Sequence, residues 1–149
     1  MSVRETAVQG PNVIGATGGS GTRVVARIVR RGGLFIGTNL NVSEDALDFG
    51  DYSDRWINVF LAHRPVDRAS TLRAEMTHDL ETTVERHLLP LDAISRPWGW
   101  KEPRSVFLLP FFASYFSGLK FLHVVRDGRD MAYSANQNQI GRASCRERV

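Results

Sequence analysis

Short apolar runs alternate with amphipathic stretches along the chain. Residues 12–16 have the length and the β-branched side chains of a short buried strand. In residues 20–31, valine and isoleucine recur at helical spacing and arginines occupy the opposite side, which predicts a helix. Gly32 and Gly33 then end this helix, as glycine commonly does. Residues 34–37 predict a second short strand.

The middle of the chain is predicted to be a polar loop followed by two helices. Residues 38–54 are polar and rich in turn-forming residues, so we expect a loop that runs over the surface. Residues 55–63 predict a short helix. Leucine, methionine and valine spaced by four predict a longer helix over residues 69–89.

The segment that follows predicts two further strands, each leading into a helix. Residues 98–103 form a plausible strand that ends at a proline, and residues 105–116 form an apolar helix that contains Pro110. Residues 119–125 are a nearly continuous apolar run, which is typical of a parallel strand covered on both faces. Residues 126–138 predict a turn and a helix. This alternation predicts an α/β fold with a mainly parallel sheet, in which ligands bind beyond the carboxyl ends of the strands.

Composition places the chain among globular proteins. Its 149 residues suit one domain or part of a larger one, and 42% of them are hydrophobic. No run approaches the ~20 apolar residues that a membrane helix needs. The N-terminal residues lack the apolar core of a secretory signal, so we expect a cytoplasmic protein with no membrane partner.

The last ten residues, IGRASCRERV, are polar and arginine-rich, unlike the chain before them. Their back-translation resembles a common sequencing adapter. We therefore predict that residues 1–139 are a partial domain and that residues 140–149 are a non-native tail; an ordinary basic tail is the alternative. Without the three arginines and one glutamate of this tail, the net charge falls from +3 to +1. The basic charge is then no argument for a nucleic-acid partner.

A glycine-rich segment, VIGATGGSGTR (residues 13–23), joins the first predicted strand to the first predicted helix. Glycines let a backbone approach a phosphate closely and point N–H groups at it, and the helix adds its positive N-terminal end. The candidate anion-binding residues are Gly18, Gly19, Ser20, Gly21, Thr22 and Arg23. The usual phosphate loop, GxxxxGK[ST], has a lysine where this chain has Gly21. A turn that only packs the helix on the strand is the alternative.

A second candidate site follows the last predicted strand. Arg126 stands where a guanidinium can hold a phosphate with two hydrogen bonds. Ser134 comes eight residues later, about two helical turns on, and its hydroxyl could reach the same anion. The alternative is a surface ion pair, Arg126 with Asp130 or Asp127 with Arg129, of little energetic value.

Taken together, the two segments resemble the sulfotransferases that use 3′-phosphoadenosine 5′-phosphosulfate (PAPS). In that family the first loop, here GGSGTR, holds the 5′-phosphosulfate, and the second, here RDGRDMAYS, holds the 3′-phosphate. The resemblance covers about residues 13–138 and implies that residues 18–23 bind the 5′ side of PAPS, while Arg126 and Ser134 bind its 3′-phosphate. It also implies a P-loop nucleotide-kinase-like three-layer sandwich, truncated at its C-terminus. Its reaction would move a sulfuryl group from PAPS to a hydroxyl or amine of a small molecule, glycan or peptide.

The chain departs from the family at one informative position. The family usually has lysine or arginine just before its Ser/Thr-Gly-Thr, where this chain has Gly19. Because sulfuryl transfer depends on placement and on cations that offset developing charge, another cation is needed. Lys101, in WGWKEPRS, is our candidate for this catalytic cation, and Arg23 is the second choice. The alternative is that Lys101 pairs with a nearby carboxylate and only holds structure.

The acceptor side requires a base that takes the acceptor's proton. Glu44 is the candidate, with Asp45 and Asp48 in the same segment; the alternative, which the sequence favours for any one of the three, is a solvated acidic loop. We predict no metal site. Two other functions stay open: a P-loop nucleotide kinase or NTPase, disfavoured by the missing lysine, and a catalytically inert nucleotide-binding module.

Overall fold

The structure is a computed structural model that describes residues 10–17, 19–63, 66–67, 70–91 and 96–133. The helices in this part of the chain are α2 (Thr22–Arg31), α3 (Leu47–Ala62), α4 (Thr71–Leu88), α5 (Ser105–Tyr115) and α6 (Gly128–Ala132). The strands are β1 (Asn12–Ala16), β2 (Gly99–Lys101) and β3 (Lys120–Val124). The predicted tail, residues 140–149, lies outside the described residues.

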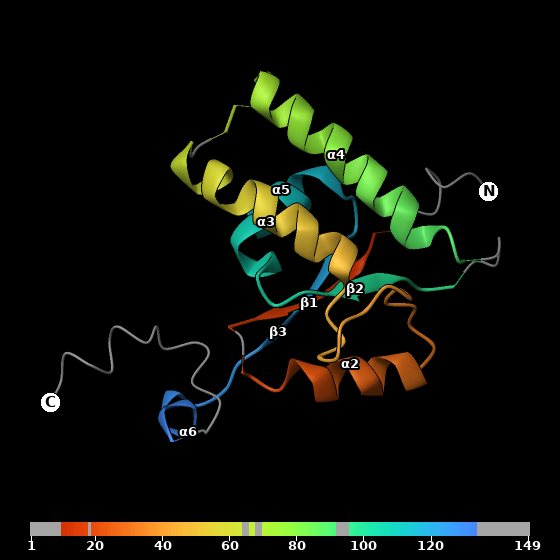
Figure 1. The fold of residues 1–149 in the computed structure, drawn as a ribbon, viewed down its shortest axis with the longest axis vertical. Helices are drawn as coiled ribbons and strands as arrows, with labels where there is room; N and C mark the ends of the chain where they lie inside the picture. Colours follow the sequence, from red (N-terminus) through yellow and green to blue (C-terminus); the bar gives the residue numbers. More distant parts are fainter. Residues whose placement is uncertain (1–9, 18, 64–65, 68–69, 92–95, 134–149) are drawn as a thin grey trace, which may run out of the picture.

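The three strands form one all-parallel sheet in the order β2-β1-β3 (Figure 1). β1 is the central strand, and its Val13 is paired with Trp100 on one side and with Phe121 on the other. The sheet is flanked by helices: α2 lies on one side, and α3, α4 and α5 lie on the other (Figure 1). The predicted α/β class with a parallel sheet is therefore confirmed.

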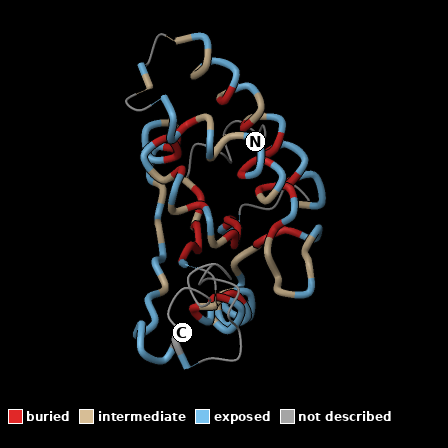
Figure 2. Tube along the Cα trace, turned by 60° about the vertical axis from the view of Figure 1, so that its left-hand side comes forward, coloured by how far each residue is buried: buried red, intermediate tan, exposed pale blue. Residues whose placement is uncertain are grey.

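The sheet separates two cores of unequal size. Successive side chains of a strand point to opposite faces, so Val13 enters the large core beside α3, α4 and α5, and Ile14 enters the small core beside α2. The large core is rich in aromatic rings; Phe49 stacks on Trp100 with ring centroids 3.7 Å apart. Figure 2 shows that the buried stretches of the chain alternate with exposed ones, as amphipathic elements around a core require.

Most predicted elements are present, and the informative differences concern residues 34–37, the start of α3 and the exposure of β3. Residues 34–37 form only a single bridge, between Phe35 and Trp98, in place of a strand. α3 begins at Leu47, inside the segment that we expected to be a loop. That segment is mostly polar, but one side of the helix that it forms faces the core, because Phe49 and Tyr52 are buried in the large core.

β3 also differs from its prediction. Its apolar sequence suggested a strand covered on both faces, yet Leu122 is 46% exposed and His123 is exposed too. Within the described residues, β3 pairs with β1 alone. The strand therefore forms one edge of the described sheet.

Candidate functional site

A cavity of about 770 Å³ opens where β1 and β2 end. The carboxyl ends of parallel strands meet at this edge, which is where open α/β sheets bind ligands. The lining comes from the end of β1 and the loop after it, the start of α2, the loop before α3, α3 itself and the segment from the end of β2 to the start of α5. Its residues include Thr17, Gly19, Gly21, Thr22, Arg23, Asn41, Ser43, Asp45, Asp51, Asp54, Lys101, Glu102, Arg104 and Phe107.

The loop after β1, residues 17–21, is called the glycine loop here. Gly19 and Gly21 have φ angles of 74° and 87°, in the left-handed region that favours glycine. A Cβ atom at Gly21 would meet no other atom within 4 Å, so its backbone borders open space. Ser20 is buried and its hydroxyl donates to the carbonyl of Thr17, so Ser20 shapes the loop and is not a lining residue. Gly18 lies outside the described residues.

The N-terminus of α2 opens into the same cavity through Thr22 and Arg23. Its N-cap residue is Gly21, no side chain caps it, and its first turn contains no acidic residue. The first N–H groups of a helix have no partner within the helix, and the helix dipole makes this end attractive to anions. The glycine loop and the start of α2 can therefore hold an anionic group.

Arg126 reaches the glycine loop from the end of β3. Its Nη1 donates to the carbonyl of Gly19 at 3.2 Å, although the two residues are 107 positions apart. Asp127 and Arg129 pair with each other at 2.8 Å, which leaves Arg126 outside that surface pair. The fold thus brings together the two segments that the sequence suggested for anion binding. Ser134, the other residue predicted for the second anion, lies outside the described residues.

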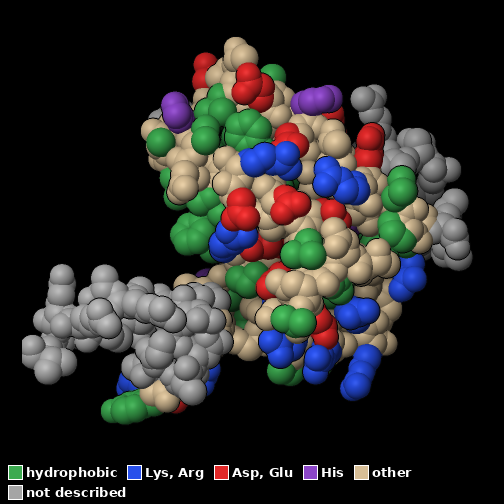
Figure 3. Space-filling view, in the orientation of Figure 1, with side chains coloured by type: hydrophobic (Ala, Val, Ile, Leu, Met, Phe, Trp, Pro, Cys, Tyr) green, Lys and Arg blue, Asp and Glu red, His purple; other side chains and the backbone are tan. Residues whose placement is uncertain are grey.

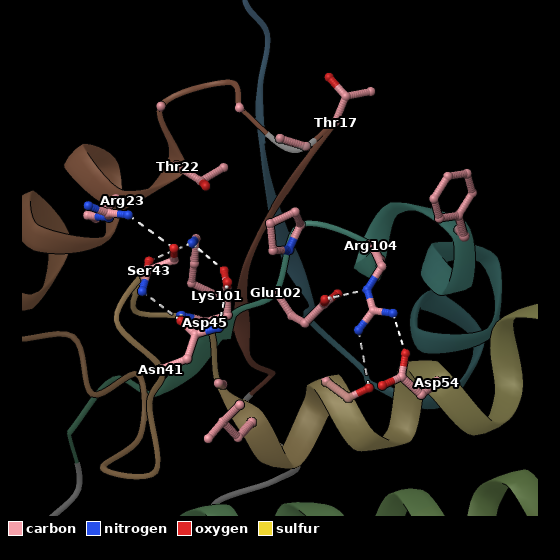
Figure 4. A pocket seen from close by; sticks show the side chains of 18 of the residues that line it. Thr17, Thr22, Arg23, Asn41, Ser43, Asp45, Asp54, Lys101, Glu102 and Arg104 are labelled. Atoms are coloured by element: carbon pink, nitrogen blue, oxygen red, sulfur yellow. Dashed lines mark hydrogen bonds and ion pairs between the residues drawn. The ribbon is translucent and has the colours of Figure 1, made fainter. Parts of the chain in front are cut away.

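Lys101, the predicted catalytic cation, lines the cavity and yet is only 2% exposed. Its Nζ donates to the carboxylate of Asp45 and, at 2.9 Å, to the carbonyl of Ser43 (Figure 4). This carboxylate pairing is the alternative that the sequence left open. Lys101 is therefore placed at the site, but its charge is already balanced by the loop before α3.

Glu44, the predicted base, is not one of the lining residues. Its carboxylate binds Arg27 at 2.7 Å and lies 3.6 Å from Arg30, both on α2. The hydrogen bond from Arg27 is the main reason why the pKa of Glu44 is lowered from its ordinary value. Glu44 ties its loop to α2, and the next residue, Asp45, is the carboxylate of this loop that lines the cavity.

Two further lining residues, Glu102 and Arg104, belong to the same KEPR segment as Lys101; the sequence placed Arg104 beside Lys101 at a strand end but gave no role to Glu102. Glu102 is 3% exposed, and its burial raises its pKa, while Arg104 beside it acts in the opposite direction. Arg104 donates to Glu102 at 2.8 Å and also binds Asp54 of α3 (Figure 4). The segment after β2 is therefore a network of paired charges.

Charged side chains also cover the outer surface. On the face shown in Figure 3, acidic and basic side chains are interspersed over the upper part, whereas basic side chains prevail at the bottom, where the arginine-rich α2 lies. Among the described residues, no group of three or more His, Cys, Asp or Glu side chains is arranged to hold a metal ion. None of the described helices is long and apolar enough to cross a membrane.

Comparison with known proteins adds no assignment: no family model, no curated protein and no solved structure matches the chain. What the cavity can do therefore follows from its own residues.

Proposed function

We propose that this chain is the PAPS-binding part of a sulfotransferase, with a P-loop nucleotide-kinase-like arrangement of its α/β fold. The observation that carries the proposal is the hydrogen bond between Arg126 and the Gly19 carbonyl. It brings the two segments of the family resemblance to one edge of the sheet, as two anionic groups of one nucleotide require. Either segment alone would be a weak indication.

In this proposal the glycine loop and the start of α2 receive the 5′-phosphosulfate. The left-handed glycines, the uncapped helix start and the absence of acidic residues from its first turn all suit an anion. Arg126 receives the 3′-phosphate, with Ser134 as its predicted partner. Gly19 stands where the family has a cation, and the missing positive charge is supplied by Lys101 and Arg23, which line the cavity.

The proposed reaction breaks the bond between sulfur and the bridging oxygen of the phosphosulfate and forms a bond from sulfur to the acceptor oxygen or nitrogen. The bridging oxygen keeps the electron pair, which leaves adenosine 3′,5′-bisphosphate, and a carboxylate takes the acceptor's proton. Asp45 replaces Glu44 as the proposed base because it lines the cavity. Lys101 and Arg23 are the cations proposed to offset charge on the leaving oxygen.

Calorimetry with adenosine 3′,5′-bisphosphate, ADP and ATP with Mg²⁺ tests this function. The wild-type protein is expected to prefer the 3′-phosphorylated ligand. Arg126→Ala should weaken binding of that ligand roughly tenfold or more and leave ADP binding almost unchanged, because it removes charge-assisted bonds to the 3′-phosphate. The matched control is Arg129→Ala, three residues on in an exposed pair with Asp127, which should leave both affinities within about twofold.

Other outcomes point to the rival functions. Preference for ATP with Mg²⁺ would support a nucleotide kinase or NTPase and contradict the proposal. Equal losses for both nucleotides in Arg126→Ala would show that Arg126 does not read the 3′-phosphate. Selective binding of the 3′-phosphorylated ligand, without turnover of PAPS by the full protein with acceptors, would support an inert nucleotide-binding module.

A further inference from the structure

The ammonium group of Lys101 occupies an unusual position for a lysine. It lines a cavity, yet it is almost fully buried and needs a compensating charge. That charge is supplied by Asp45, and the carbonyl of Ser43 accepts a second hydrogen bond at 2.9 Å. Both acceptors belong to the loop before α3, so Lys101 links β2 to that loop.

The same loop also engages Arg23, the cation at the start of α2. Arg23 donates to the hydroxyl of Ser43 at 3.0 Å (Figure 4). Ser43 therefore lies between the two cavity cations, with its hydroxyl bound by Arg23 and its carbonyl bound by Lys101. Lys101 is not free for a ligand while its contacts hold, whereas Arg23 is exposed and donates here to a neutral hydroxyl.

Asp45 is anchored independently of Lys101. The side chain of Asn41 donates to the second carboxylate oxygen of Asp45 at 3.0 Å. Asn41 also accepts hydrogen bonds from the backbone N–H groups of Ser43 at 2.8 Å and Asp45 at 2.9 Å. If the bond from Lys101 were lost, these contacts would still hold Asp45 at the cavity.

An anion bound at the glycine loop competes with Asp45 for Lys101. Gly19, Gly21, Thr22 and Lys101 line one cavity, and a phosphosulfate carries more negative charge than the single carboxylate that now balances the ammonium. We propose that Lys101 exchanges partners when the donor binds. Its ammonium group releases the Asp45 carboxylate and binds the anion of the donor. This inference rests on the proposed function and deepens it.

The exchange would couple the two halves of the reaction. Before the donor binds, Lys101 occupies one oxygen of Asp45 and Asn41 occupies the other. After the exchange, the first oxygen is available to accept the acceptor's proton. Donor binding therefore prepares the base, and the donor is expected to bind before the acceptor.

A double-mutant cycle with Lys101→Met and Asp45→Asn tests the exchange, with adenosine 3′,5′-bisphosphate and ADP as probes in calorimetry. Asp45→Asn removes the competitor and should tighten binding of both nucleotides roughly tenfold. In the Lys101→Met background the same substitution should have a smaller effect, because it removes only the repulsion between the Asp45 carboxylate and the anion and no ammonium remains to be released. Looser or unchanged binding in Asp45→Asn, or additive effects in the cycle, would overturn the exchange.

The same titrations separate the two proposals. Equal wild-type affinity for the two nucleotides would contradict the sulfotransferase function, whereas the cycle still reports on the exchange through whichever nucleotide binds. If the wild-type protein bound neither nucleotide, both proposals would fail.

A measurement on the wild-type protein covers the case in which Asp45→Asn does not fold. On addition of adenosine 3′,5′-bisphosphate, the ¹⁵N signal of the Lys101 ammonium and the carboxyl ¹³C signal of Asp45 should shift together. The carboxyl signal of Asp79, which accepts from Trp56 at 2.6 Å and is not a lining residue, should stay in place. An unchanged Asp45 signal at saturation would contradict the exchange.

Discussion

Two walls of the cavity differ in how their charged groups are arranged. The glycine-loop wall consists of Thr17, Gly19, Gly21, Thr22 and Arg23 and contains no carboxylate. The paired wall consists of Asp45, Asp54, Lys101, Glu102 and Arg104, and each cation in it is bound to at least one of the carboxylates. The first wall attracts anions through backbone N–H groups and the start of α2, and in the second wall each cation already has a carboxylate partner.

The difference shows how a polar cavity can be stable without a ligand. Backbone N–H groups at a helix start carry only partial charges and remain in contact with solvent, so they cost little when unoccupied. A buried ammonium or carboxylate carries a full charge, and it is tolerated only with a partner. The paired wall should therefore be sensitive to removal of one partner, and the glycine-loop wall should be sensitive to backbone conformation.

The largest effect is expected at Asp45. Asp45→Asn leaves the Lys101 ammonium buried and unpaired, so the free energy of unfolding should fall by about 3–5 kcal/mol. The matched control is Asp54→Asn, which breaks a pair with Arg104 in which the carboxylate side chain is 66% exposed, and which should cost no more than about 1 kcal/mol. Urea unfolding measures both, and similar losses in the two variants would remove the distinction between a buried and an exposed pair.

An intermediate effect is expected at Gly21. Gly21→Ala places a Cβ on a residue with φ of 87°, which should destabilise the protein by about 1–2 kcal/mol although space is available. Gly50→Ala is the control within the same cavity, because Gly50 lies in α3 and should gain about 0.5–1 kcal/mol from better helix propensity. Thermal unfolding compares them, and destabilisation by Gly50→Ala alone would contradict the account of the glycine loop.

The smallest effect is expected from the titration of Glu102, because Arg104 opposes the rise in pKa that burial causes. A folded-state pKa above the unfolded value means that Glu102 stabilises the fold below about pH 4.3 and that this contribution is lost as the pH rises through the folded pKa. In Glu102→Gln, the decline of stability with rising pH above about 4.3 should therefore be shallower than in wild type. Urea unfolding at several pH values measures the slope, and a steeper decline in the variant would reverse the assigned sign.

Local sequence patterns predict which helices and strands this fold contains better than they predict where each one begins and ends. β1 was predicted with its observed bounds, and the helix spaced by leucine, methionine and valine is α4. The start of α3 was missed because its inward residues, Phe49 and Tyr52, stand among aspartates and next to Gly50. Their helical face is recognisable only once the aromatic core that receives them is known.

The glycine loop is a local feature, and its capacity to receive an anion could be predicted from the sequence. Two glycines before a helix require no distant contact to adopt left-handed conformations, so their pattern alone predicted a place for an anion. The ion-pair partners of the charged residues could not be predicted from the sequence. Nothing in the sequence distinguishes Glu44, which binds α2, from Asp45, which binds Lys101.

Charge pairing is decided by tertiary structure because it depends on which distant segments meet. Lys101 and Asp45 are 56 positions apart, and Arg126 and Gly19 are 107 positions apart. Only the parallel order β2-β1-β3 brings these segments to one edge. Local residue order therefore accounts for a loop that can receive an anion, and the sheet decides which cations surround it and which carboxylates hold them.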